Sequence, residues 1–214
     1  MPKPANKLFK TWARKGSVYS LEQGRELLGL VRHAAEAVLK RQRLVLEDYK
    51  KYATPHGVYV CVNRGQLHLG CGGQVEARAL YSAVVAATRR VLEALRPAPH
   101  PGELPALAFE LHILGKPSLI RVRNADDYLR VIRLGREGLM IREWLHFGIV
   151  LANTPIEHGW DIERTLRQLC ISAGLTMDAW RDLHHKIWRF DAQIFAEKDS
   201  KVVELRTEVW RRLD

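Results

Sequence analysis

The spacing of apolar residues predicts a mixture of helices and strands along the chain. Apolar residues recur at intervals of three and four from Leu27 to Val38, which is typical of an amphipathic helix. Just before them, Ser20 and Gln23 have the spacing of a capping box, in which each side chain bonds the other residue's backbone N–H. These features predict a long helix that begins after Ser20 and continues to about Glu47.

A β-hairpin is predicted next. The segment 57–62 is rich in β-branched and aromatic residues, which favours a strand. Asn63-Arg64-Gly65 resembles a turn of three residues, and residues 66–70 can return as the second strand.

The rest of the chain continues the mixture, with a proline-rich loop at 97–105. We expect further helices at 77–95, 125–134, from 162 to Gly174, around Trp180 and at 202–213, and further strands at 106–114, 138–142, 146–151 and 186–196. Because helices and strands do not alternate strictly, the fold class is predicted to be α+β, with mixed, largely antiparallel sheets, and not a doubly wound parallel sheet.

Length and charge limit the classes of protein that fit. The chain has 214 residues, enough for one large domain or two small interlocked subdomains. No apolar run approaches the ~18 residues of a membrane span, so no membrane association is predicted. The net charge of +10 is concentrated in residues 1–51, which hold 12 Lys and Arg against 5 Asp and Glu. This basic front, which includes an extension at residues 1–19, favours nucleic acid, an acidic partner or simply a solvated helix face.

The cysteines are few and unpaired in the sequence. Cys61, Cys71 and Cys170 form no CxxC motif, and an odd, sparse set favours a reducing cytosol and a cytoplasmic protein. In a hairpin with a three-residue loop, Cys61 faces Leu67, and Cys71 lies roughly 13 Å further along the strand. Since a disulfide requires Cα atoms within about 7 Å, Cys71 is expected to be a free thiol.

Cys71 stands among glycines, in the sequence H-L-G-C-G-G, and two interpretations remain open. In the first, Gly70, Gly72 and Gly73 let a ligand approach the main chain beside His68, and Cys71 acts as a nucleophile or redox group. In the second, the glycines form a bulge or tight bend, and Cys71 is a small buried apolar residue. In a regular strand His68 and Cys71 point to opposite faces, so no base for Cys71 is evident locally.

Motifs for metals and nucleotides are absent from the sequence. None of the nine histidines falls in HExxH or in a zinc-like Cys/His spacing, although His68, His112 and His146 could converge from separate strands. There is no Walker loop, no GxGxxG and no GxSxG. We therefore predict no metal site and no cofactor.

A second cluster, Glu157-His-Gly-Trp-Asp161, has a complete structural explanation. Gly159 permits a sharp turn, Trp160 packs against it, and Asp161 caps the next helix. The aromatic residues that follow are expected in the core and not as a platform for nucleic-acid bases; they are Trp180, Trp188, Phe190 and Phe195.

Taken together, these segments resemble the AMMECR-one domain family over residues 20–197. The family commonly reads L-R-G-C-I-G where this chain reads H-L-G-C-G-G, and E-x-G-W-D where it has residues 157–161. Leu104-Pro105 and the closing strand with Arg189-Phe190 follow in the family's order. The chain departs from the pattern at Leu69, where arginine is usual, and at Gly72, where isoleucine is usual, and it lacks a clear D-P-R-F-type segment.

The resemblance implies an α+β fold of two subdomains joined through shared strands, with a cleft beside the cysteine loop. It implies no reaction, because the family's biochemical activity is unestablished, and it implies a MEMO-like or radical-SAM protein as a partner. The leading hypothesis is therefore a domain that binds a small ligand or peptide at His68 and Gly70–Gly73. The alternatives are a cysteine-dependent enzyme using Cys71, a module for nucleic acid or acidic partners, and a protein-interaction scaffold.

Overall fold

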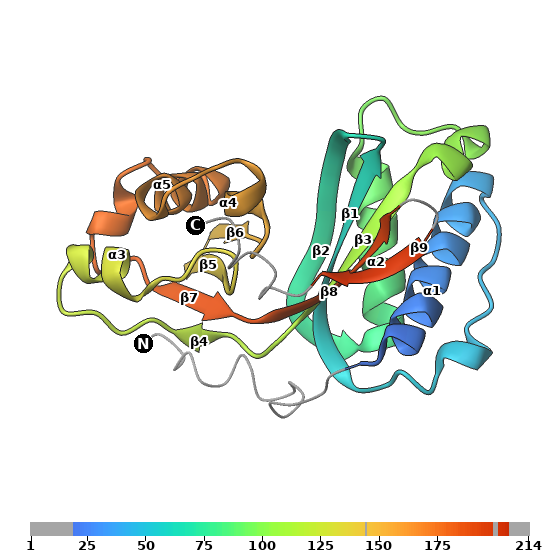
Figure 1. Cartoon of the computed structure of the whole chain (residues 1–214), viewed down its shortest axis with the longest axis horizontal. Coiled ribbons are helices and arrows are strands. Elements are labelled where there is room, and N and C mark those ends of the chain that lie inside the picture. Colours follow the sequence, from blue (N-terminus) through green and yellow to red (C-terminus); the bar gives the residue numbers. More distant parts are fainter. Residues whose placement is uncertain (1–18, 144, 199–200, 206–214) are drawn as a thin grey trace. The chain divides into compact units, whose positions relative to one another are not determined.

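A computed structural model describes residues 19–143, 145–198 and 201–205, which divide into two compact units (Figure 1). The first unit comprises residues up to 116 together with 193–205, and the second comprises residues 117–192. The predicted basic extension at residues 1–19 lies outside the described residues except for Tyr19.

The first helix, α1 (Leu21–Lys40), begins where the capping box predicts. The Ser20 hydroxyl accepts from the Gln23 N–H, and the Gln23 side chain accepts from the Ser20 N–H. The helix ends before the expected Glu47, because Arg41 adopts the left-handed conformation with φ 55° and terminates the ladder. A short 3₁₀ turn, η2 (Glu47–Tyr49), follows.

The first unit is built on a five-stranded sheet in the order β2-β1-β3-β8-β9. Its elements are β1 (Pro55–Arg64), β2 (Leu67–Ala79), α2 (Leu80–Ala94), η3 (Pro101–Ala106), β3 (Ala108–Leu114), β8 (Ala192–Lys198) and β9 (Lys201–Leu205). Helices α1 and α2 pack against this sheet (Figure 1).

The core of the first unit lies on one face of that sheet. Alternate residues of β1, namely Val58, Val60 and Val62, are fully buried in a cluster with apolar side chains of α1 and α2. Because side chains alternate along a strand, Tyr59 and Cys61 belong to the opposite face. The two faces therefore differ in chemistry, one being hydrocarbon and the other partly polar.

The second unit contains a four-stranded sheet in the order β4-β7-β5-β6, with short helices around it. Its elements are β4 (Ser118–Leu119), η4 (Ala125–Asp127), α3 (Tyr128–Val131), β5 (Gly138–Glu143), β6 (His146–Val150), α4 (Thr154–Glu157), α5 (Ile162–Ser172), η5 (Ala179–Arg181) and β7 (Ile187–Phe190). Trp180 is completely buried in its core, with Leu166 and Leu169 of α5.

The segment predicted as one strand at 186–196 supplies strands to both sheets. It divides at Asp191 into β7, which joins the four-stranded sheet, and β8, which joins the five-stranded sheet. The predicted α+β class with largely antiparallel sheets is confirmed. The cleft that the resemblance implies stays a prediction.

One predicted helix is wrong in its first turn. Residues 201–205, expected to open a C-terminal helix, form β9, which pairs with β8 from Lys198 opposite Lys201 to Ile194 opposite Leu205. Two adjacent valines favour a strand, and the neighbouring β8 edge provides the hydrogen-bond partners. The remainder of the predicted helix, residues 206–214, lies outside the described residues. Among the described helices, none is long and apolar enough to cross a membrane.

Candidate functional site

The hairpin of β1 and β2 has a register that the sequence pattern did not reveal. Its turn consists of Gly65 and Gln66, since Arg64 already pairs with Leu67. The next pair, Asn63 with His68, keeps this register. The register then shifts by one residue, because Val62 lies opposite Gly70 and not opposite Leu69. Leu69 is therefore an extra residue in β2, a β-bulge, and its side chain packs against the core of the first unit.

The bulge places Cys71 directly opposite Cys61. Their Cα atoms are 4.1 Å apart and their sulfurs form a disulfide of 2.03 Å. The prediction that Cys71 is a free thiol is therefore wrong. It assumed a turn at residues 63–65 and an unbroken strand. The turn lies instead at residues 65–66, which shifts the pairing by three residues, and the bulge shifts it by one more.

The two sulfur-bearing residues differ in exposure. Cys61 is 3% exposed on the central strand β1, whereas Cys71 is exposed on β2, at the edge of the sheet. Cys71 is therefore neither the buried apolar residue nor the free nucleophile that the two sequence interpretations offered.

His68 lies on the same face as Cys71, contrary to the expectation for a regular strand. The extra residue Leu69 changes the alternation, and His68 Nε2 is 3.7 Å from Cys71 Sγ. The other ring nitrogen, Nδ1, is 2.9 Å from Asn63 Oδ1, which fixes the orientation of the imidazole. His68 itself is exposed.

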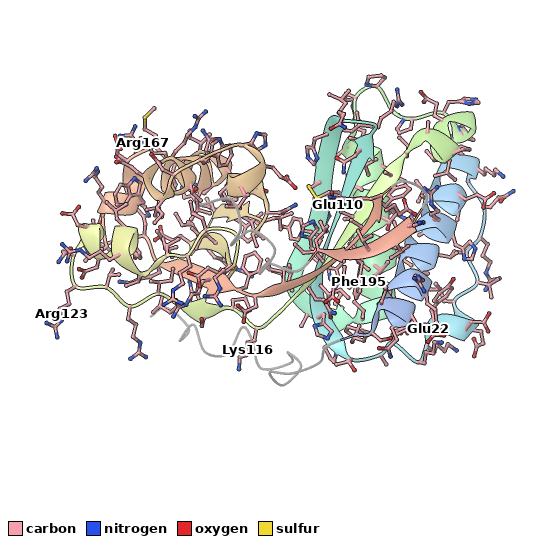
Figure 2. All side chains as sticks on the ribbon, in the orientation of Figure 1. Glu22, Glu110, Lys116, Arg123, Arg167 and Phe195 are labelled. Carbon is pink, nitrogen blue, oxygen red and sulfur yellow. A yellow bond between two sulfur atoms is a disulfide. The ribbon has the colours of Figure 1, made fainter. Side chains whose placement is uncertain are left out.

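Cys61 has its own histidine, from β3. His112 Nε2 lies 3.7 Å from Cys61 Sγ and 3.6 Å from Glu110 Oε2, and the His112 side chain is fully buried. Its Nδ1 has no hydrogen-bond partner among the described residues. Glu110, labelled on the five-stranded sheet in Figure 2, also accepts from Asn63 Nδ2 at 3.3 Å.

Glu110 carries a negative charge in this setting. Burial raises the pKa of its carboxyl, but the hydrogen bond and charge of His112, with the charges of Lys198 and His68, outweigh burial and hold the pKa below its ordinary value. These contacts form a ring that the disulfide closes. On one side, Glu110 contacts Asn63, which contacts His68, which faces Cys71 Sγ. On the other side, Glu110 lies beside His112, which faces Cys61 Sγ. We call these residues, with Cys61 and Cys71, the cystine ring.

Three members of the cystine ring were missed in the sequence as site residues: Cys61, Asn63 and Glu110. His112 was named there only as a histidine that could converge with His68 from a separate strand. The available signal was alternation, because Cys61 with Asn63, and Glu110 with His112, are each two positions apart in otherwise apolar strands. Such spacing places both members of a pair on one face, away from the core. With the disulfide closed, the described residues contain no group of three or more that could hold a metal ion.

Two of the glycines predicted to bind a ligand, Gly72 and Gly73, pack closely against neighbouring backbone. A Cβ on Gly72 would lie 2.6 Å from the backbone nitrogen of Val91 in α2, and one on Gly73 would lie 2.2 Å from the carbonyl oxygen of Val58. Both glycines are buried. Gly70 remains half-buried beside Cys71, with φ +156°, a value that favours glycine. Of the predicted loop, His68, Gly70 and Cys71 are accessible.

The cluster at 157–161 has the structural role that the sequence suggests. Gly159 has φ +60°, Asp161 accepts from the Arg164 N–H at 2.7 Å, and Glu157 accepts from Asn153 Nδ2 at 2.7 Å. Trp160 stacks on His158 with ring centroids 4.9 Å apart. These contacts fix the turn that begins α5.

Helix α5 also borders a surface hollow of about 430 Å³. The hollow contains no predicted site residue, and two of its charged groups, Arg167 and Glu163, form an ion pair at 3.0 Å. Its lining residues are Asp161, Glu163, Arg164, Arg167, Gln168, Ile171 and Met177.

The fold and the loop define an α+β protein with a cysteine hairpin in its first unit, and comparison with known proteins identifies the class. The AMMECR1 family model matches residues 28–195, and the chain belongs to this family. It is 33% identical over 194 residues to Protein MJ0810 of Methanocaldococcus jannaschii, covering 85% of this chain and 94% of that one.

Two further similarities agree with this assignment. A protein of Thermofilum pendens is 32% identical over 211 residues, covering 89% of this chain and 98% of the relative. The crystal structure of uncharacterized protein PH0010 from Pyrococcus horikoshii matches with a TM-score of 0.78 and 29% identity, covering 86% of this chain and 97% of that chain. The relatives are archaeal, and their names assign no activity.

Proposed function

We propose that this chain binds a small ligand or a short peptide at the exposed end of the β1–β2 hairpin. The binding surface comprises His68, Gly70 and Cys71, and we call it the hairpin surface. The observation that carries the proposal is the bulge at Leu69, which brings an exposed imidazole and an exposed sulfur to the same face. Bulges that redirect a side chain in this way are common beside functional sites.

The position of β2 adds support for a peptide. β2 is an edge strand, with β1 as its neighbour within the described sheet. An extended peptide can pair with such an edge through its main chain, while its side chains reach pockets or polar groups nearby. Leu67, which is 61% exposed, gives the same edge an apolar contact.

A cysteine enzyme that begins its reaction with a resting Cys71 thiolate is less well supported, because the sulfur is held in a disulfide. A MEMO-like or radical-SAM partner, and a cytoplasmic location, remain proposals. A disulfide is compatible with a cytoplasmic location in hyperthermophilic archaea, because their intracellular proteins are rich in disulfides.

Native mass spectrometry with a library of small molecules and short peptides tests the binding proposal. Each hit is measured again on His68→Ala and on a matched control, His184→Ala, whose side chain is 96% exposed on the second unit. We expect about tenfold weaker binding to His68→Ala, as for loss of one hydrogen bond to a polar ligand, and unchanged binding to the control. No hit, or equal loss in both variants, contradicts the proposal.

A further inference from the structure

The two halves of the disulfide differ in ways that matter for chemistry. Cys71 is exposed at the sheet edge, whereas Cys61 is 3% exposed and lies on a central strand. Each sulfur has an imidazole nitrogen 3.7 Å away, from His68 and His112 respectively. A molecule from solvent can therefore reach one sulfur, and a buried polar group stands beside the other.

We propose that the Cys61–Cys71 disulfide is a reactive centre that exchanges with thiol-bearing molecules through Cys71. This inference rests on the proposed function, since it names thiols as the class of ligand that the hairpin surface receives. Accessibility of a sulfur is one determinant of the rate of thiol–disulfide exchange, and exposed disulfides are among the labile ones.

The exchange conserves atoms and electrons. A ligand thiolate attacks Cys71 Sγ and forms a mixed disulfide; the Cys61–Cys71 bond breaks, and its electron pair passes to Cys61 Sγ. A second ligand thiolate then attacks the ligand sulfur of the mixed disulfide and releases Cys71 as a thiolate. Two ligand thiols are oxidised to one disulfide, while the protein disulfide is reduced to two thiols. A disulfide-bearing molecule reverses both steps.

The neighbours of Cys61 favour its departure as the leaving sulfur. His112 Nε2 lies between Cys61 Sγ and the Glu110 carboxylate, at 3.7 and 3.6 Å, so an N–H there can donate to the sulfur as negative charge develops. A cation or hydrogen-bond donor beside a sulfur lowers the pKa of its thiol, and a leaving thiol of lower pKa departs faster.

In the reduced protein, His68 can accept the proton of the Cys71 thiol, because Nδ1–H donates to Asn63 and leaves Nε2 as an acceptor. Its Nε2 faces the sulfur, while its Nδ1 is held by Asn63 Oδ1 at 2.9 Å. Cys71 is thus the sulfur that both receives attack in the oxidised protein and attacks a disulfide when reduced.

Trapping of mixed disulfides by intact-mass spectrometry tests this assignment. Reduced Cys61→Ser and Cys71→Ser proteins are incubated with glutathione disulfide, and bound glutathione is measured over time. We expect Cys61→Ser to gain one glutathione at Cys71 at least about tenfold faster than Cys71→Ser gains one at Cys61. The buried Cys170 is present in both variants, and Cys170→Ser is the matched control that should change nothing.

A measurement on the wild-type protein does not depend on how the variants fold. Reduced glutathione is added to the oxidised chain, the reaction is quenched by acid, and new thiols are alkylated and counted by mass. We expect two new thiols while near-ultraviolet circular dichroism remains native. A disulfide that opens only after denaturation, or equal trapping by the two variants, overturns the inference. If non-thiol ligands still bind the hairpin surface in a His68-dependent manner, the proposed function survives that result.

Discussion

Cys61 and Cys71 stand directly opposite each other on neighbouring strands, with Cα atoms 4.1 Å apart. The disulfide thus joins two strands that the sheet already holds together on both sides of the pair, from Pro55 to Arg64. The sequence separation is 10 residues, so the cross-link closes a short loop. A short loop removes little entropy from the unfolded chain, and the remaining strand pairs do not depend on the sulfurs.

We therefore predict that the protein remains folded when the disulfide is reduced. For a loop of this length the entropy model gives a loss of at most about 3 kcal/mol in the free energy of unfolding. Denaturant unfolding with and without a phosphine reductant measures the difference. The double variant Cys61→Ala with Cys71→Ala is the control, and reductant should not change its stability. Cooperative unfolding of the wild type on reduction alone would contradict the prediction.

A second prediction concerns Gly72, which packing requires. Its added Cβ would lie 2.6 Å from the nitrogen and 2.8 Å from the Cα of Val91, and these backbone atoms in α2 cannot rotate away. Gly72→Ala should therefore lower the free energy of unfolding by about 1–3 kcal/mol, as overpacking does. Trapping of glutathione at Cys71, measured well below the melting temperature, should persist. Loss of trapping without loss of stability would instead indicate a role at the hairpin surface.

The sequence predicted the features that depend on neighbouring residues. The capping box of Ser20 and Gln23 fixed the start of α1, and Asp161 fixed the start of α5, because each involves bonds across three positions. The family resemblance predicted two subdomains, and the division of 186–196 at Asp191 between two sheets gives that arrangement a covalent basis.

The candidate site was less predictable, because it depends on register. The position of the turn and one extra residue, Leu69, decide whether Cys61 meets Cys71, and neither alters the hydrophobic pattern strongly. His112 and Glu110 enter the site from β3, and no local pattern specifies which strand lies beside β1. In the same way, the partner strand β8 decided that residues 201–205 are a strand and not a helix.

Two glycines of α1 should respond in opposite directions to the same substitution. A Cβ on Gly24 would lie 2.2 Å from the ring of the buried Phe195, whereas a Cβ on Gly29 would meet only the Tyr49 hydroxyl, at 4.0 Å. Gly24→Ala should lower the free energy of unfolding by about 1–3 kcal/mol. Gly29→Ala should raise it by about 0.5–1 kcal/mol, since alanine restricts the unfolded chain and favours the helix. Thermal unfolding of both variants beside the wild type gives the comparison, and equal shifts would show that the Phe195 contact is absent.

The last prediction concerns His56, a buried histidine at the start of β1. It is 5% exposed, its Nδ1 lies 3.2 Å from the Leu114 carbonyl oxygen, and its Nε2 has no hydrogen-bond partner among the described residues. Burial lowers the pKa of this imidazole from 6.5, and the hydrogen bond to Leu114 offsets burial only in part. Protonation would place an N–H on Nε2 where it has no acceptor.

The direction of the pH effect follows from that lowered pKa. As pH falls below 6.5, the unfolded chain takes up a proton on His56 while the folded chain does not, so the free energy of unfolding decreases. The loss ends once pH is below the folded pKa, where both states are protonated. Denaturant unfolding between about pH 7.5 and 5 should therefore show a slope that His56→Gln reduces. An identical slope in wild type and His56→Gln would mean that this imidazole accepts its proton as readily in the folded protein as in the unfolded chain.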